Sequence, residues 1–380
     1  MLIMNSRYKV SDMDVALIIN LFISATLISL SRSEPICIVD TSDTSNLVCK
    51  DVSTDFPDNM YYGNKNLQCY KCHIKVFSSS TFKHDNVLLS INISHSGLQA
   101  IQPSAFKHLG NLQNIYFQNN MITNVSVGAF EGLRQVYEIN LKNNLIADLT
   151  PGFVRDLEVT YLSLANNKLT EIPNYAFKDV VVITNLILSQ NKIKKINYDS
   201  FSGLNFLEYL ELDNNNLCYI PIGAFKNLKD LSYLNLANNK LSRFSLGTFS
   251  GLTSLTALIL ANNSIKNFEG NELLPMQSLL RLDIKGNSIY YLDAHLIFSA
   301  APTIKVISIE DNFYSCSSLA NIIRYFKEKK VKIETHTGFY DIQNINGVAC
   351  IDGIVEEVTD KANFLRRASD EAQTSVIYCV

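Results

Sequence analysis

Residues 231–255 read LSYLNLANNKLSRFSLGTFSGLTSL, and this stretch decides the fold of the chain. The pattern L-x-x-L-x-L-x-x-N-x-L is filled, in order, by Leu231, Leu234, Leu236, Asn239 and Leu241. Leucines that alternate with other residues predict a short strand with one buried face. The asparagine falls where the chain must turn, and its amide can satisfy backbone groups that the turn exposes. Such a unit cannot bury its apolar face alone, so similar units must flank it on both sides.

The same pattern recurs through residues 88–312. Ten residues occupy its asparagine position at a spacing of 24, with one spacing of 23 and one of 25: Ser96, Asn120, Asn144, Asn167, Asn191, Asn215, Asn239, Asn263, Asn287 and Asn312. We therefore predict an α/β solenoid of about ten repeats, shaped like a horseshoe, with a parallel β-sheet on its concave side. The return segments on the convex side are too short for long helices, so we expect extended stretches and short helical turns there.

A phenylalanine follows the asparagine position by nine or ten residues in seven repeats: Phe106, Phe130, Phe153, Phe177, Phe201, Phe225 and Phe249. We expect these rings to stack as a buried row on the convex side of the sheet. Leu273 and Ile297 take the place of phenylalanine in the repeats that follow.

Composition and the N-terminal stretch bear on location. The 380 residues carry a formal net charge of −3 without a large basic excess, which argues against nucleic-acid binding.

At the N-terminus, basic residues precede an apolar run over residues 15–30, and small residues at 31–33 suit a signal peptidase. We predict a secretory signal over residues 1–33, with an uncleaved signal anchor as the alternative. No membrane span is expected after cleavage, so the protein should be secreted.

Most of the eight cysteines lie outside the repeats, in a pattern that suits an oxidising, extracellular compartment. A disulfide-bonded N-terminal cap is predicted over residues 34–87, and its cysteines allow three pairings: Cys37, Cys49, Cys69 and Cys72. The run at residues 69–73 also has the C-x-x-C-H form of a haem attachment site, but its surroundings offer no axial ligand. A zinc site on Cys69, Cys72 and His73 is disfavoured because the thiols of a secreted chain would be oxidised, so no cofactor or metal is predicted.

The C-terminal part carries a second predicted cap, over residues 313–350. Apolar residues at spacings of three and four predict an amphipathic helix between Ser317 and Val331. A disulfide between Cys316 and Cys350 would close this cap. Residues 351–380 form a tail of uncertain structure, with a solvated or packed segment favoured over a coiled coil.

Two cysteines have no local partner in the sequence. Cys218 interrupts the repeats, and the favoured interpretation is a buried free thiol. Cys379 is a candidate for an intermolecular disulfide, which would give a disulfide-linked dimer.

These features resemble the typical class of extracellular leucine-rich repeat proteins over roughly residues 35–350. The resemblance rests on the repeat LEYLELDNNNLCYIPIGAFKNL at 207–228, the paired-cysteine N-terminal flank and the C-terminal flank NFYSCSSLANIIRYFKEKKV at 312–331. Phe313 and Tyr314 replace the usual Pro-Trp of that flank, and the second nearby cysteine is missing. This single-cysteine form is similar to soluble insect proteins, including mosquito immune ones. The resemblance implies binding of proteins, lipids or microbial patterns rather than catalysis.

The residues that flank the strand leucines should point out of the concave sheet. Tyrosine and apolar side chains are enriched at contact surfaces, although tyrosine also simply suits strands. We predict a ligand-binding surface that includes Tyr116, Tyr161, Ile187, Tyr209, Glu211, Tyr233, Asn235 and Ile259. N-x-S sequons predict glycosylation at Asn92, Asn124 and Asn262.

No catalytic pattern is present in the sequence. The six histidines show no metal spacing, and neither a phosphate-binding glycine loop nor G-x-S-x-G occurs. The sequence therefore predicts a secreted, non-enzymatic protein that binds a protein or another extracellular macromolecule, with a role in innate immunity. A structural or adhesive matrix protein is the first alternative, and a secreted regulator or carrier of another protein is the second.

Overall fold

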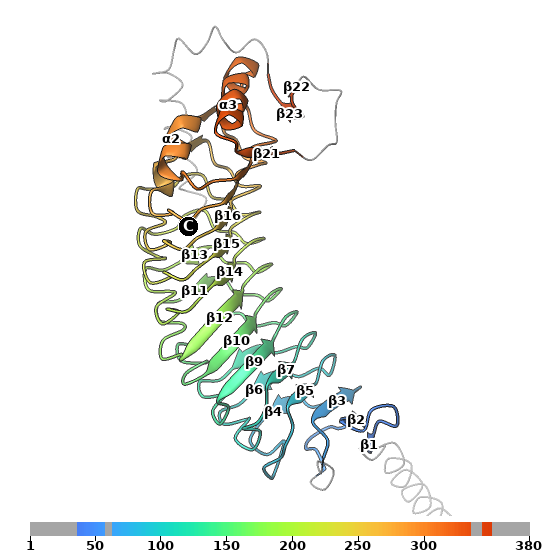
Figure 1. Cartoon of the computed structure of the whole chain (residues 1–380). Helices are drawn as coiled ribbons and strands as arrows, with labels where there is room; N and C mark the ends of the chain where they lie inside the picture. The colour runs from blue at the N-terminus through green and yellow to red at the C-terminus, as the bar shows by residue number, and fades with distance from the viewer. Residues whose placement is uncertain (1–35, 58–62, 336–343, 352–380) are drawn as a thin grey trace, which may run out of the picture.

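The repeats form one curved solenoid around a 14-stranded sheet (Figure 1). The computed structural model describes residues 36–57, 63–335 and 344–351. All neighbouring strands of the sheet are parallel except the first pair. In spatial order they are β1 (Ile36–Val39), β2 (Asn46–Lys50), β3 (Asn66–Tyr70), β5 (Ser90–Asn92), β7 (Asn114–Tyr116), β9 (Gln135–Asn140), β10 (Glu158–Ser163), β12 (Val182–Ile187), β14 (Tyr209–Glu211), β15 (Tyr233–Asn235), β16 (Ala257–Ile259), β18 (Arg281–Asp283), β20 (Val306–Ser308) and β21 (Lys332–Glu334).

The ten predicted repeats correspond to the strands from β5 to β20, so the predicted solenoid with a parallel sheet is confirmed. The sheet also extends beyond them, through β2 and β3 on one side and β21 on the other. These outer strands cover the sheet edges of the first and last repeats, which would otherwise present unpaired backbone groups.

The 24-residue period sets the register of the sheet. Leu210 pairs with Leu234, which pairs with Leu258, and all three side chains are fully buried. Because side chains alternate across a strand, the residues on either side of these leucines point to the opposite, concave face. Residues at the same repeat position therefore line up in a row across neighbouring strands.

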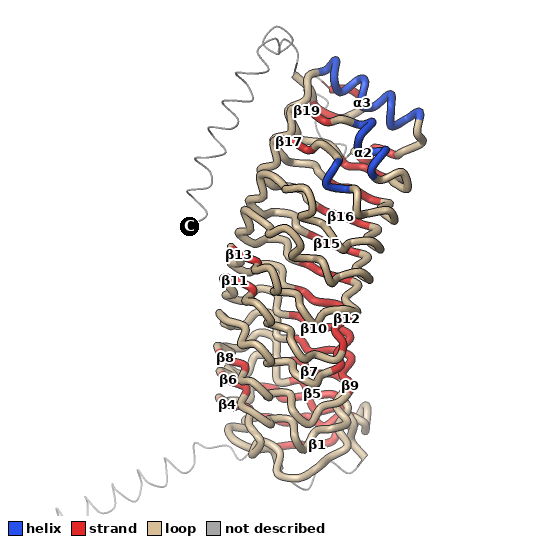
Figure 2. Tube along the Cα trace, turned by 90° about the vertical axis from the view of Figure 1, so that its left-hand side faces the viewer, coloured by secondary structure: helices blue, strands red, loops and turns tan. Residues whose placement is uncertain are grey.

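The convex side consists of short elements, as predicted (Figure 2). Small parallel sheets lie there, formed by β4 (Val76–Phe77), β6 (Ala100–Ile101) and β8 (Asn124–Val125), by β11 (Glu171–Ile172) and β13 (Lys195–Ile196), and by β17 (Asn267–Phe268) and β19 (Tyr291–Leu292). Helical turns enter only near the C-terminal end of the described repeats, as the 3-10 turn η1 (Asn271–Leu273) and helix α2 (Ala294–Ala300).

Asparagine side chains join each repeat to the one before it. The Asn239 side chain accepts a hydrogen bond from the Leu217 N–H at 2.9 Å and donates to the carbonyls of Leu212 and Leu236 at 3.0 and 3.1 Å. The same bonds recur at the other eight asparagines from Asn120 to Asn312. The predicted role of this position in satisfying turn backbone groups is therefore confirmed.

The predicted phenylalanine row is buried but stacks in three runs. Ring centroids are 5.4 Å apart for Phe106 and Phe130, and 6.1 Å apart for Phe153 and Phe177. Phe225 lies 5.7 Å from Phe201 and 6.3 Å from Phe249. Phe130 and Phe153, at the first break, are 23 residues apart, whereas Phe177 and Phe201, at the second, keep the 24-residue spacing, so the spacing alone does not decide where the stacking is interrupted.

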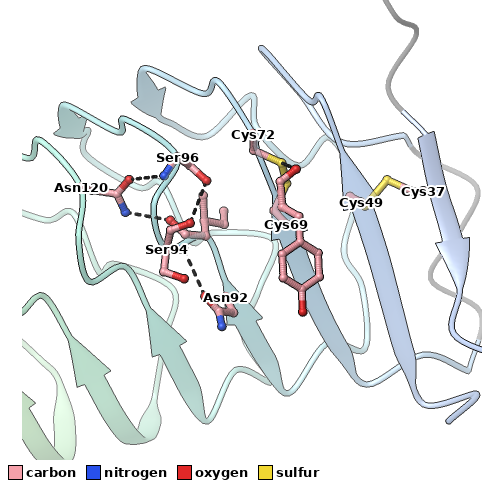
Figure 3. Close-up of a disulfide and its surroundings, with 10 residues drawn as sticks. Cys37, Cys49, Cys69, Cys72, Asn92, Ser94, Ser96 and Asn120 are labelled. Carbon is pink, nitrogen blue, oxygen red and sulfur yellow. Dashed lines mark hydrogen bonds between the residues drawn. A yellow bond between two sulfur atoms is a disulfide. The ribbon is translucent and has the colours of Figure 1, made fainter. Parts of the chain in front are cut away.

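Disulfides close the N-terminal cap (Figure 3). Cys37 and Cys49 face each other across the antiparallel pair β1–β2 with Cα atoms 4.0 Å apart, and Cys69 pairs with Cys72. The pairing that the sequence left open is thus settled as two local bridges. Among the described residues, the hydroxyl of Ser96, which stands first in the asparagine row, bonds only to the Ser94 carbonyl, so the asparagine bonds that join successive repeats start at Asn120.

The C-terminal cap is built around helix α3 (Cys316–Glu328), which confirms the predicted amphipathic helix. The Ser315 hydroxyl caps its N-terminus by accepting from the Ser318 N–H at 3.2 Å. Its buried residues are those of the predicted apolar stripe: Leu319, Ile322, Ile323 and Phe326. The Cys316–Cys350 disulfide connects this helix to the hairpin β22 (Asn344–Ile345) and β23 (Val348–Ala349).

Two predicted segments, the signal at 1–33 and the tail at 352–380, lie outside the described residues. Within residues 36–57, 63–335 and 344–351, no helix combines the length and apolar character that a membrane crossing requires.

Candidate functional site

The concave face carries two rows of side chains, one on each side of the buried strand leucines, and most of these side chains are partly exposed. One row holds, in register, Glu138, Tyr161, Asn185, Tyr209, Tyr233, Ala257 and Arg281. The other holds Tyr116, Asn140, Ser163, Ile187, Glu211, Asn235, Ile259 and Asp283. All eight residues of the predicted ligand-binding surface therefore belong to these two rows.

A tyrosine pair stands at the middle of the first row. Tyr209 on β14 and Tyr233 on β15 stack with ring centroids 4.3 Å apart and an interplanar angle of 3°. The pairing follows from the 24-residue period, which places the two rings directly opposite each other on adjacent strands. Two rings fixed in this way offer a rigid, flat surface that loses little conformational entropy when a partner covers it.

Acidic side chains surround these tyrosines. The Tyr209 hydroxyl donates to Glu211 Oε1 at 2.8 Å. Burial raises the pKa of the Tyr209 phenol, and the hydrogen bond and charge of Glu211 raise it further. Burial and the charge of Glu138 likewise raise the pKa of the Tyr116 and Tyr161 phenols. These hydroxyls stay protonated at neutral pH and are therefore able to donate hydrogen bonds.

Three polar residues in or beside this surface were missed by the sequence analysis. Ser189 Oγ lies 2.9 Å from Glu211 Oε2 and 2.7 Å from Asp213 Oδ1. Glu138 accepts a hydrogen bond from the Asn140 amide at 3.1 Å. The signal was present in the sequence, since Ser189 and Asp213 occupy the same repeat position 24 residues apart.

Not every predicted contact residue is accessible to a ligand. Ile187 is only 6% exposed, so it supports its neighbours more than it contacts a ligand. Beyond Ala257 the face becomes charged, and Arg281 forms an ion pair with Glu334 of β21. The central part of the face, from Tyr161 to Ile259, is thus bounded by charged residues at both ends.

A scan against protein-family models matches the leucine rich repeat at residues 71–155, 158–217 and 207–265, which together make up just over half of the chain. The chain belongs to the leucine-rich repeat family. No curated protein sequence matches it.

Solved structures with the same fold support this assignment. A chain of the octameric complex of Latrophilin 3, Unc5D and FLRT2 (LRR) is 21% identical, with a TM-score of 0.68 over 82% of this chain and 95% of that one. An internalin (inlF) from Listeria monocytogenes is 17% identical, with a TM-score of 0.55 over 81% of this chain and 86% of that one. At these identities the likeness concerns the leucine-rich repeat fold alone.

The three sequons occupy different environments on the leucine-rich repeat solenoid. Asn124 is exposed on β8, on the convex side, and its amide makes no hydrogen bond to the described residues. Asn262 is exposed, but its amide donates to Asn238 Oδ1 at 3.0 Å. Asn92 is half-buried on β5 beside Tyr116, and its side chain accepts from the Ser94 N–H. Glycosylation at these positions stays a prediction, and Asn124 offers the most accessible amide.

Every cysteine in the described part of the chain is disulfide-bonded, including Cys218. The interpretation of Cys218 as a buried free thiol is therefore wrong. It failed because Cys218 has no cysteine near it in the sequence, and distant pairings cannot be read from spacing. The intermolecular disulfide predicted for Cys379 falls outside the described residues.

Proposed function

We propose that this chain is a secreted leucine-rich repeat protein that binds a protein or another extracellular macromolecule through its concave face. The observation that supports it best is the central tyrosine surface, in which Tyr161, Tyr209 and Tyr233 are partly exposed on a rigid sheet. The similar FLRT2 (LRR) chain is itself part of an assembly with other proteins. Such surfaces gain affinity because large side chains are already held in place.

Secretion and an innate-immune role belong to the same proposal. Disulfide-bonded caps at both ends of the solenoid suit an oxidising compartment. We propose that residues 1–33 act as the signal, that 34–87 and 313–350 are the caps of the repeats at 88–312, and that 351–380 form a tail. The immune role rests on the single-cysteine C-terminal flank, which is similar to that of soluble insect proteins.

A pair of matched variants tests the concave face. Asn185→Trp places a large side chain between Tyr161 and Tyr209, and Leu246→Trp places the same side chain on a return segment at a residue that is 73% exposed. We expect the secreted chain, used as bait in extracellular fluid, to retain a specific partner. Asn185→Trp should abolish retention, and Leu246→Trp should preserve it. Equal retention by both variants would exclude the concave face as the binding site.

A disulfide-linked dimer also stays part of the proposal. The three local bridges pair six cysteines within one chain, so the dimer hypothesis rests on Cys379, which either bonds within its own chain or joins two chains. Non-reducing electrophoresis of the secreted protein separates the two cases. We expect a dimer band that Cys379→Ser converts to monomer, and a wild-type protein that migrates only as monomer would end the dimer hypothesis.

A further inference from the structure

The central concave face carries negative charge that no described cation neutralises. Between β10 and β16, Glu211 is the one charged residue among those that flank the buried strand leucines, and Asp213 lies two residues further along the chain. Neither carboxylate forms an ion pair with any described Lys, Arg or His. A partner that covers this face must therefore either supply a positive charge or bury two unpaired carboxylates at high cost.

Neutral groups hold both carboxylates in place. Glu211 accepts from the Tyr209 hydroxyl through one oxygen and lies within hydrogen-bond distance of Ser189 Oγ through the other. Asp213 shares that same serine hydroxyl and also accepts from the Asn214 amide. A hydroxyl has a single hydrogen, so it can satisfy only one of the two carboxylates at a time. These contacts orient the two carboxylates but cancel none of their charge, and a cation between them would relieve their mutual repulsion.

An aromatic surface lies directly beside these carboxylates. Tyr233 stacks on Tyr209 through one ring face, and the next residue in its row is the small Ala257. The side chain of Ala257 is too small to cover a tyrosine ring, and Tyr233 is partly exposed, so a flat group can reach the outer part of the stack. The nearest basic residue in the row, Arg281, is held by its ion pair with Glu334.

We propose that Tyr209, Tyr233, Glu211 and Asp213 form a subsite for an arginine side chain of a protein partner. The proposal rests on the concave-face binding proposed above and specifies the chemistry of the partner. A guanidinium group matches this arrangement because it stacks on aromatic rings and donates from a planar fork to carboxylates. An ammonium group can use the charge but not the flat surface, so the site should prefer arginine to lysine.

Blocked hexapeptides of arginine, lysine and citrulline test the subsite directly against the full secreted chain. Citrulline has the shape of arginine without its charge. At low ionic strength, where such contacts are strongest, we expect hexa-arginine to bind roughly threefold or more tightly than hexa-lysine. Hexa-citrulline should not bind measurably. Equal binding of hexa-citrulline and hexa-arginine would overturn the proposal, as would failure of hexa-arginine to bind.

Two double variants remove the same amount of charge from different places. Glu211→Gln with Asp213→Asn removes the subsite charge, whereas Glu171→Gln with Asp230→Asn removes two charges from exposed positions outside the two concave rows. We expect the first to weaken hexa-arginine binding about tenfold, a typical effect of losing paired charges at an interface. The second should change it less than twofold. Equal losses of hexa-arginine affinity in the two double variants would show that the peptide is attracted nonspecifically to an acidic protein, and would overturn the proposed subsite.

The same variants separate this inference from the proposed function. If Asn185→Trp abolishes retention of a natural partner while Glu211→Gln with Asp213→Asn leaves it intact, the concave face binds but the arginine subsite is wrong. If retention survives Asn185→Trp as well, the proposed function itself fails. Circular dichroism of each variant establishes that it is folded before binding is compared.

Discussion

Replacing Phe201 by alanine is expected to lower the free energy of unfolding by about 3–5 kcal/mol, the usual cost of deleting a buried phenylalanine ring. The ring is 1% exposed and lies 5.7 Å from that of Phe225, at an interplanar angle of 20°. Removing it would leave a cavity between successive repeats, which few surrounding groups can fill. The measurement is urea denaturation followed by circular dichroism, with disulfides kept intact.

Phe206 provides the matched control for this experiment. It lies five residues further along the same repeat, but its side chain is 55% exposed. Phe206→Ala deletes the same ring from the surface, where substitutions usually change stability by about 0.5 kcal/mol or less. Similar losses for the two variants would show that the buried phenylalanine row contributes no special stability. Because repeat arrays can unfold in stages, the denaturant slopes of both variants must match that of the wild type.

The sequence was sufficient to predict whatever depends on the repeat period. A spacing of 24 places Tyr209 opposite Tyr233 and stacks Leu210 on Leu234, and the structure has both. The pattern could not reveal β2, β3 and β21, because these strands lie in cap segments that lack the leucine and asparagine positions. The sheet is therefore longer than the ten repeats that the pattern counts.

The candidate site was predictable in position but not in detail. Which residues face the concave side follows from strand alternation, so the tyrosines could be named in advance. The sharing of Ser189 between Glu211 and Asp213 depends on the side-chain rotamers of all three residues, which a sequence does not specify. The burial of Ile187 was missed for a similar reason, since neighbouring side chains rather than its own position decide how much of it is covered.

The second large effect is expected at Asn215, one of the asparagines that join successive repeats and that together form the asparagine ladder. Its side chain accepts from the Ile193 N–H at 3.0 Å and donates to the carbonyls of Leu188 and Leu212 at 3.0 Å each. Both carbonyls also accept from a neighbouring ladder asparagine. The Ile193 N–H is therefore the group that Asn215→Ala leaves buried without its acceptor. We expect a loss on the order of 3 kcal/mol in the free energy of unfolding, from this orphaned donor and the lost bonds.

Asn215→Asp distinguishes the donor role of the amide from its acceptor role. A carboxylate can still accept from the Ile193 N–H, but it would place a buried negative charge against the Leu188 and Leu212 carbonyls. At pH 7 the Asn215→Asp variant should therefore be no more stable than Asn215→Ala. Burial would raise the folded-state pKa of this carboxyl above its unfolded value. The folded state would then bind the proton more tightly, so the stability of Asn215→Asp should rise relative to Asn215→Ala as the pH falls from 7 toward 5.

Denaturation midpoints at several pH values measure this difference, with Asn205→Ala as the control for losing an exposed asparagine from the end of the preceding repeat. That control should cost about 0.5 kcal/mol or less. If Asn215→Asp equals the wild type at pH 7, the two donated bonds contribute nothing and the ladder acts only as an acceptor of backbone N–H groups. If Asn215→Ala costs no more than Asn205→Ala, the asparagine position is a feature of the turn alone, and the repeats are held together by their leucines and phenylalanines.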